Sequence, residues 1–273
     1  MTPGDMSSLQ NPWSDPGSPP PEMPAPAGSA LPEDPPWTGL DVLSVVAATV
    51  VALIILPLMA VLLAHQLVFP KASFADIMQI PEVVLVVQVL IYVVVFALIY
   101  YLLRTRTGRF SEPVRWNWPK SSWAGFLILG ALLYFALMGV GQLLPIPKHL
   151  PIDRFFQTAR EATLMSVLSV TLAPFMEELF FRGLLYPVLA RRFGMGVSIF
   201  LTGAAFGVLH GAQLKYSWAV LIIFLVGMAL TAVRAVTKSV AASFLVHVGY
   251  NGTLSALLFA ATSGFRHLER LNQ

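Results

Sequence analysis

The stretch Pro174-Phe175-Met176-Glu177-Glu178-Leu179-Phe180-Phe181-Arg182-Gly183 places two adjacent carboxylates and a guanidinium inside an otherwise apolar run that begins near Ala162. No other acidic residue occurs between Ala162 and Leu268. A charged side chain in hydrocarbon costs at least about 2.5 to 3.5 kcal/mol on insertion scales, so two neighbouring glutamates need partners or a task there. We therefore predict that this pair is the functional centre of a membrane-embedded helix.

The composition is typical of a polytopic membrane protein. Of the 273 residues, 56% are hydrophobic and only 11% are charged. The formal net charge of +3 comes from bases in short connections between apolar runs, where they indicate topology and contacts with lipid headgroups. We therefore expect no nucleic-acid partner. The sequence contains no cysteine, which excludes disulfides, thiolate nucleophiles and thiolate metal ligands.

The apolar runs predict an all-α fold with about seven transmembrane helices after an N-terminal tail. Residues 1–40 are rich in Pro, Gly and Ser and predict a disordered tail. We expect N-terminal transmembrane helices at 41–160, a helical core at 161–263 and a C-terminal tail at 264–273. The predicted spans cover about 42–64, 83–103, 123–144, 162–189, 194–210, 218–236 and 240–261.

The loop after the second predicted span is strongly basic. Tryptophans at 116, 118 and 123 are interleaved with its bases and suit a membrane interface. Because short basic loops stay in the cytoplasm, we expect this loop and the N-terminus inside and the C-terminus outside. The bases of the loop are Arg104, Arg106, Arg109, Arg115 and Lys120.

Pairs of residues four apart occur on three of the predicted spans. They are Glu178 with Arg182, Phe206 with His210, and His247 with Asn251. A spacing of four puts both members of a pair on one helix face. The first pair has the distance and order of an ion pair, whereas Glu177 points roughly 100° away and is free to face a cavity.

Two further features of these spans predict local structure. Pro174 lies just before the glutamates, where it bends the helix and either opens space beside Glu177 or forms an ordinary kink. Gly203, Gly207 and Gly211 recur at intervals of four, a spacing that lets two membrane helices approach closely.

A glutamate, two histidines and an asparagine are sufficient to activate a water and to stabilise the oxyanion that forms when the water attacks a carbonyl. A purely structural interpretation remains open. A Glu–Arg pair can staple two membrane helices, and a single intramembrane histidine can hydrogen-bond a neighbouring helix. The concentration of such side chains on three helices favours one shared site.

The motifs Glu177-Glu178-x-x-x-Arg182, Phe206-x-x-x-His210 and His247-x-x-x-Asn251 resemble, in order, those of the CPBP family of intramembrane proteases. That family includes the type II CAAX prenyl endopeptidases and the bacterial Abi proteins. The resemblance covers roughly residues 162–261 and implies an intramembrane endopeptidase whose catalytic core is this region. Its eight-span members imply one span more than the apolar runs predict.

The resemblance also implies roles for the residues of the motifs. Glu177 is expected to be the general base for the hydrolytic water, with His210 helping to hold that water. His247 and Asn251 are expected to stabilise the oxyanion. Glu178 and Arg182 would position Glu177.

The residues leave the metal question open. Glu177, His210 and His247 could supply three zinc ligands with an open fourth position. A metal-free mechanism needs only a glutamate with a tuned pKa, which two adjacent carboxyls in a low dielectric favour. We expect no cofactor, with zinc as the alternative.

The expected substrate is a membrane-embedded or lipidated protein or peptide, and the expected location is a bacterial plasma (inner) membrane with several passes through the lipid bilayer. Two other functions are consistent with the same residues. Intramembrane carboxylates and histidines also build the pathways of ion- or proton-coupled transporters. A non-catalytic immunity or partner protein could use the same fold.

Overall fold

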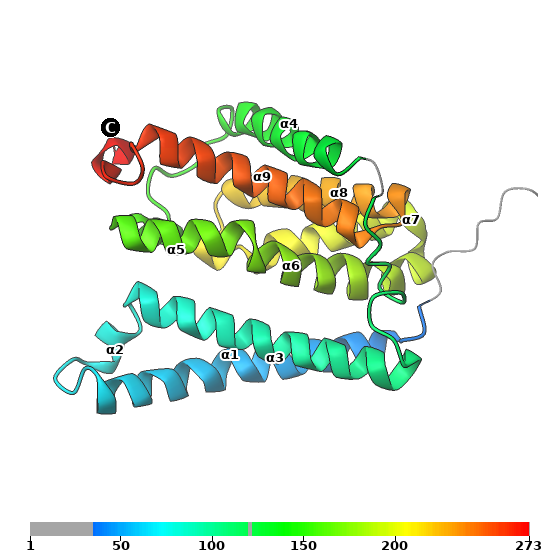
Figure 1. Ribbon diagram of the computed structural model, residues 1–273, viewed down its shortest axis with the longest axis horizontal. Helices are drawn as coiled ribbons and strands as arrows, with labels where there is room; N and C mark the ends of the chain where they lie inside the picture. Colours follow the sequence, from blue (N-terminus) through cyan, green and yellow to red (C-terminus); the bar gives the residue numbers. More distant parts are fainter. Residues whose placement is uncertain (1–34, 120–121, 273) are drawn as a thin grey trace, which may run out of the picture. The chain divides into compact units, whose positions relative to one another are not determined.

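The computed structural model describes residues 35–119 and 122–272. Within these ranges the chain forms helices and connections and no strand, which confirms the all-α prediction (Figure 1). Residues 1–34 of the predicted disordered tail lie outside the described residues. The elements are α1 (Gly39–Leu67), α2 (Phe74–Ile77), α3 (Pro81–Thr107), α4 (Trp123–Gly141), η1 (Pro151–Phe156), α5 (Ala159–Val170), α6 (Leu172–Glu178), η2 (Leu179–Leu185), α7 (Tyr186–Leu209), η3 (Ala212–Leu214), α8 (Ala219–Thr237), α9 (Val240–Ala261) and η4 (Leu268–Asn272).

In the described part of the chain, six helical segments are long and apolar enough to cross a membrane: α1, α3, α4, the continuous run Ala159–Leu209, α8 and α9. Many of their large apolar side chains point outward. On α1, for example, Ile54 is 63% exposed and Leu58 is 55% exposed. Apolar side chains on the outside and backbone hydrogen bonds satisfied within each helix suit a hydrocarbon solvent. The protein is therefore an integral, multi-pass membrane protein.

The difference between six segments and the seven predicted spans arises at Gly194. The run Ala159–Leu209 has helical dihedral angles on both sides of this residue, but Gly194 itself adopts φ 75° and ψ 172°. The chain turns back there, so α7 consists of two antiparallel parts (Figure 1). The second part, residues 195–209, rises only about 22 Å and is shorter than a typical span. A positive φ costs glycine little, which explains why glycine occupies this corner.

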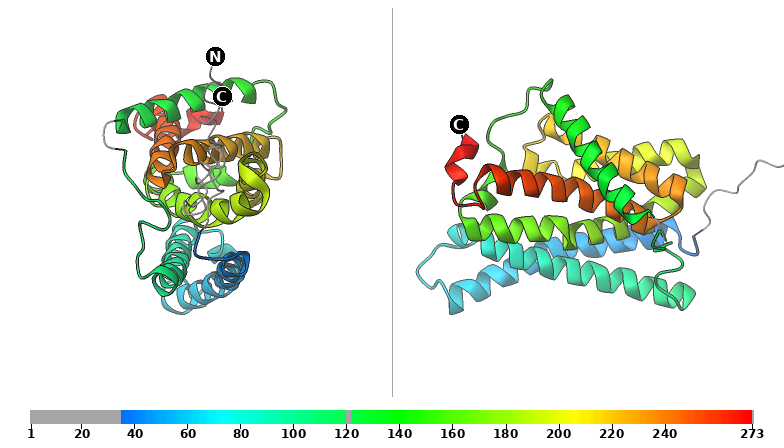
Figure 2. Two further views of the ribbon diagram at one scale, coloured as in Figure 1. Left: turned by 90° about the vertical axis from the view of Figure 1, so that its right-hand side faces the viewer. Right: turned by 45° about the horizontal axis from the view of Figure 1, so that its top comes forward.

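Helices α1 and α3 pack side by side and lie against the α5–α7 run (Figure 2). The contact is apolar and includes Val95 and Ile99 of α3 with Met176 and Leu179. Ring contacts extend it, since Phe96 and Phe175 lie 5.9 Å apart between centroids. Helix α3 therefore packs directly against the segment that carries the two glutamates.

The disordered tail predicted for residues 1–40 ends too late. Trp37 is completely buried, and its indole Nε1 donates a hydrogen bond to the carbonyl of Leu184 at 3.0 Å. The Arg191 guanidinium donates to the carbonyls of Pro35 and Trp37. Helix α1 then begins at Gly39 with a capping box between Thr38 and Asp41. A large aromatic ring with a satisfied N–H thus orders the residues before α1, despite their proline-rich context.

The end of the helices that carries the α3–α4 loop, the basic end, holds the strongly basic connection that the sequence predicts. Arg106 at the end of α3 pairs with Asp41 at the start of α1 (2.6 Å). The loop between α3 and α4 is bonded to the start of α9, because Val240 N donates to Arg115 O at 3.0 Å. The same end includes the Gly194 corner, with Arg191 and Arg192, and the α8–α9 connection, with Lys238 (Figure 1). By the positive-inside rule we expect this end to face the cytoplasm.

Glycines bring the core helices into close contact. A Cβ on Gly203 or Gly207 would meet atoms of α8 at 2.6 Å and 3.1 Å, which confirms the close approach predicted for these two positions. Gly211 differs, since it lies beyond the end of α7 and beneath the ring of Tyr216. A second crossing was not predicted: a Cβ on Gly249 of α9 would lie 2.2 Å from a backbone carbonyl oxygen of α4. These contacts fix α9 and α7 relative to their neighbours.

Candidate active site

The segment that carries the glutamates is interrupted by two departures from α-helical geometry. The first is at Thr171, with φ −117° and ψ −82°, between α5 and α6. Pro174 lacks the N–H that would bond the carbonyl one turn earlier, so the predicted bend occurs here. The second is η2, a π-helical segment in which the Tyr186 N–H bonds the carbonyl of Phe181. Such wide turns are frequent at functional sites.

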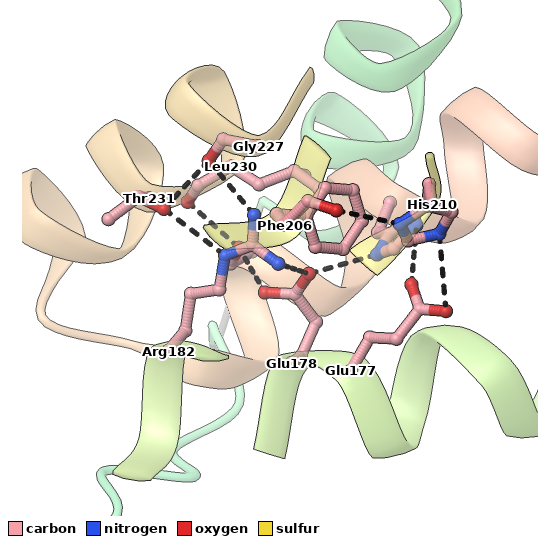
Figure 3. Close-up of polar contacts among 10 residues, drawn as sticks. Glu177, Glu178, Arg182, Phe206, His210, Gly227, Leu230 and Thr231 are labelled. Atoms are coloured by element: carbon pink, nitrogen blue, oxygen red, sulfur yellow. Dashed lines mark hydrogen bonds and ion pairs between the residues drawn. The ribbon is translucent and has the colours of Figure 1, made fainter. Parts of the chain in front are cut away.

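Glu178 and Arg182 form the predicted ion pair. The Arg182 Nη1 donates to Glu178 Oε1 at 2.8 Å, and both side chains are completely buried. Arg182 also donates from Nη2 to the carbonyl of Gly227 (2.9 Å) and from Nε to the hydroxyl of Thr231 (3.3 Å), both on α8 (Figure 3). The guanidinium is therefore held by a carboxylate, a carbonyl and a hydroxyl, as a buried cation requires.

Glu178 connects this pair to α9. Its Oε2 accepts a hydrogen bond from the Ser243 hydroxyl at 2.5 Å, and its Oε1 lies 2.9 Å from His247 Nδ1. Ser243 and His247 are one turn apart on α9, so both face the carboxylate. Glu178 thus fixes the rotation of α9 and the orientation of the His247 ring.

Glu177 faces the two histidines (Figure 3). Its Oε1 lies 3.8 Å from His210 Nε2, and its Oε2 lies 3.6 Å from His247 Nε2. The side chains of Glu177 and His210 are 19% and 21% exposed, unlike the fully buried Glu178 and Arg182. Distances of this size exceed direct hydrogen bonds but suit a bridging water. The structure therefore brings together the glutamate and both histidines of the three motifs.

The hydrogen bonds of the rings define their proton positions. His210 Nδ1 lies 2.8 Å from the carbonyl oxygen of Phe206. A carbonyl can only accept, so Nδ1 carries the proton and Nε2 of the neutral ring is an acceptor that faces Glu177. His247 Nδ1 faces the Glu178 carboxylate in the same way. Its Nε2 accepts in the neutral ring and donates in the imidazolium.

Asn251 lies one turn after His247 on α9. Its Nδ2 donates to the carbonyl of Ser169 on α5 at 2.7 Å. The acceptor of this hydrogen bond lies on α5, so Asn251 does not bond Glu177, His210 or His247 through it. The amide has a second N–H, which is the one that an oxyanion could use.

The donor types of Glu177, His210 and His247 suit zinc, because two imidazole nitrogens and a carboxylate are a common catalytic set. Among the residues that the structure describes, no group of three His, Cys, Asp or Glu side chains is already arranged to hold a metal ion. The two oxygens of Glu177 lie 3.8 Å from His210 Nε2 and 3.6 Å from His247 Nε2, so a metal ion between them would require a small approach of these side chains.

Two polar supports of the site were not predicted, Thr231 and Ser243. The Thr231 hydroxyl accepts from Arg182 and donates to the carbonyl of Gly227 at 2.7 Å, and the Ser243 oxygen, which donates to Glu178, also lies 2.9 Å from the carbonyl oxygen of Leu230. The one feature of the sequence that points to Ser243 is its position four residues before His247, which puts both on one helix face.

The comparisons with known proteins identify the part of the chain that carries this cluster. Residues 159–253 match the family model described as Rce1-like, type II CAAX prenyl endopeptidase Rce1-like. No curated protein and no solved structure matches the chain. The matched residues include all three motifs, and the match supports a CAAX-type intramembrane protease at the level of the family.

Proposed function

We propose, from the Rce1-like domain at residues 159–253, that this protein is an intramembrane endopeptidase that cleaves a membrane-associated or lipidated protein or peptide. One observation carries the proposal: the two oxygens of the Glu177 carboxylate face the Nε2 atoms of His210 and His247 at 3.8 and 3.6 Å. A water between them would contact a base and a second acceptor at once. The bacterial plasma membrane is the location that we propose for this activity.

In the proposed reaction Glu177 takes a proton from the water, which His210 Nε2 holds as the second acceptor. The resulting hydroxide attacks the carbonyl carbon of the scissile peptide, and the carbonyl oxygen becomes an oxyanion. His247, as an imidazolium with Nδ1–H on Glu178, and the second N–H of Asn251 donate to this oxygen. The oxyanion then re-forms the carbonyl, the C–N bond breaks, and the proton on Glu177 passes to the leaving amine, so that the carboxylate is regenerated.

Glu178 and Arg182 act in this proposal as positioning residues. Their ion pair is anchored to α8 through Gly227 and Thr231 and to α9 through Ser243. The Glu178 carboxylate orients the His247 ring, much as the aspartate of a hydrolytic triad orients its histidine. Movement of either side chain would therefore misplace His247.

A reconstituted cleavage assay tests the proposal. The probe is a fluorogenic peptide with a farnesylated cysteine followed by three residues, placed in liposomes with the purified protein; an unprenylated twin measures the contribution of the lipid. We expect Glu177→Gln and His210→Ala to lower kcat by about 10²- to 10⁴-fold, the usual contribution of a general base. Glu112→Gln, in an exposed loop, is the matched control and should cleave like the parent.

Two results would count against the proposal. Equal cleavage by the parent and Glu177→Gln would show that the glutamate is not the base. Glu177-dependent proton uptake into the liposomes, with no cleavage of either peptide by the parent, would favour a transporter. We propose that the water is activated without a metal; stoichiometric zinc in the purified protein, with activity lost on chelation and restored by zinc, would overturn this part.

A further inference from the structure

A cavity with polar and apolar walls lies beside the active site, and its lining includes none of Glu177, His210 and His247. Its volume is about 880 Å³, at the upper end of the range for small-molecule sites. It is formed by the start of α5, the end of α9, η1 and the C-terminal residues, which meet at the end of the helices opposite the basic end (Figure 1). No step of the proposed reaction uses this cavity.

The walls of the cavity are mainly apolar. Phe156 of η1, Met165 of α5 and Leu254 and Leu258 of α9 line it, and all four except Leu254 are partly buried. Such walls suit a hydrocarbon chain and give little reason for a polar metabolite to bind.

Two exposed cations also line the cavity, Lys148 and Arg266. Among the residues that the structure describes, neither side chain has a hydrogen bond or an ion pair. The two carboxylates of the lining are already engaged: Asp153 accepts from Leu150 N at 2.8 Å, and Glu269 lies 2.9 Å from His267 Nδ1. The two bases and two acids of the lining balance in formal charge, but both carboxylates already have local hydrogen-bond partners, so Lys148 and Arg266 are the charged groups that a ligand can pair with.

We propose that this cavity binds an anionic lipid, with an acyl chain along the apolar wall and the acidic head group on Lys148 and Arg266. Basic pockets between membrane helices bind acidic head groups for the same reason. The start of α5 and the end of α9 are ends of two candidate membrane spans, where a bilayer would present such head groups, so the lipid needs no water-soluble route to the site.

The cavity reaches the wall of the active site. Ser169, which lines it, supplies the carbonyl that accepts the Asn251 hydrogen bond at 2.7 Å. Asn251 in turn lies one helical turn from His247. A bound lipid would hold α5 and α9 together on the far side of this bond and so keep the asparagine amide in place.

Native mass spectrometry of the detergent-purified protein tests the proposal. The protein would be incubated with dioleoyl phosphatidylglycerol, with oleate and with zwitterionic dioleoyl phosphatidylcholine. We expect the two acids to be retained in preference to the zwitterion. Lys148→Gln with Arg266→Gln should bind phosphatidylglycerol about thirtyfold more weakly, from two contacts of the usual strength of a base near a lipid surface. Leu258→Trp, which fills the cavity, should reduce the retention of oleate as well.

The matched control is Lys71→Gln with Lys215→Gln, which removes the same charge from exposed sites outside the cavity lining. This control should retain both acids like the parent. Equal retention of phosphatidylcholine, or equal loss in the control and the rim variants, would overturn the proposal. Binding is measured without substrate, and Glu177→Gln should bind lipid like the parent, so the result does not depend on the protease assignment.

Discussion

The buried Glu178–Arg182 pair gives the sharpest prediction for stability. Arg182→Met removes the cation and leaves a carboxylate that is completely buried, with only Ser243 and His247 as donors. Glu178→Gln removes the anion and leaves a buried guanidinium that faces a carbonyl and a hydroxyl. Breaking a buried pair from one side costs about 3 to 5 kcal/mol, because the remaining charge has lost its compensation.

The double variant Glu178→Gln with Arg182→Met should cost less than the sum of the two single changes. Both charges are then gone, and replacement of a whole buried pair by neutral groups is often close to neutral. We therefore expect a coupling of at least about 2 kcal/mol between the two positions, within the range for residues in one network. The free energy of unfolding would be measured by titration of the detergent-solubilised protein with denaturing detergent, followed by tryptophan fluorescence.

An exposed pair supplies the control. Arg109 and Glu112 also form an ion pair, but their side chains are 73% and 67% exposed. Arg109→Met with Glu112→Gln should leave the unfolding transition unchanged, because water solvates both charges. The reasoning would be refuted if the single changes at 178 and 182 were as mild as this control, or if their effects simply added in the double variant.

Three further changes test individual contacts. Gly249→Ala should destabilise the protein by about 1 to 3 kcal/mol, because the new Cβ would meet a backbone carbonyl of α4. Gly125→Ala, which has open space around it, should be neutral or slightly stabilising, and thermal unfolding of the two variants compares them. Trp37→Phe should cost about 1 kcal/mol from the lost indole hydrogen bond, and an unchanged melting temperature would contradict the ordered start of α1. Ser243→Ala should lower kcat more than it raises KM, because its hydroxyl positions Glu178 and does not touch substrate; a change in KM alone would argue for a role in binding.

The parts of the fold that depend on hydrophobic length were predictable from the sequence. An apolar run long enough to cross a bilayer is a strong signal, and α9 begins and ends where the sequence indicates. The corner at Gly194 falls between the predicted spans 162–189 and 194–210, next to Arg191 and Arg192, although only the φ of 75° at Gly194 shows how the chain turns. The burial of Trp37 was also hidden, since its partner carbonyl lies far along the chain.

The candidate site was likewise predictable from the sequence only in part. The spacing of four between Glu178 and Arg182 predicts their ion pair, which the structure contains. The meeting of Glu177 with His210 and His247 depends on how three helices pack, which no local pattern encodes; the resemblance of the motifs supplied it. The support of Arg182 by Thr231 was not predictable, because hydroxyls on apolar helices usually bond their own backbone.

The π-helical segment Leu179–Leu185 constrains how the sequence of this site can vary in length. It follows Glu178 directly and contains Arg182, so the wide turn lies between the glutamates and the rest of the run. A π-helical turn holds about one residue more than an α-helical turn, so loss of one residue there would let the segment relax to an ordinary α-helix while the residues after it keep nearly the same face. A single-residue deletion after Arg182 should therefore be tolerated better here than in the middle of an ordinary α-helix, where it would rotate everything after it by about 100°.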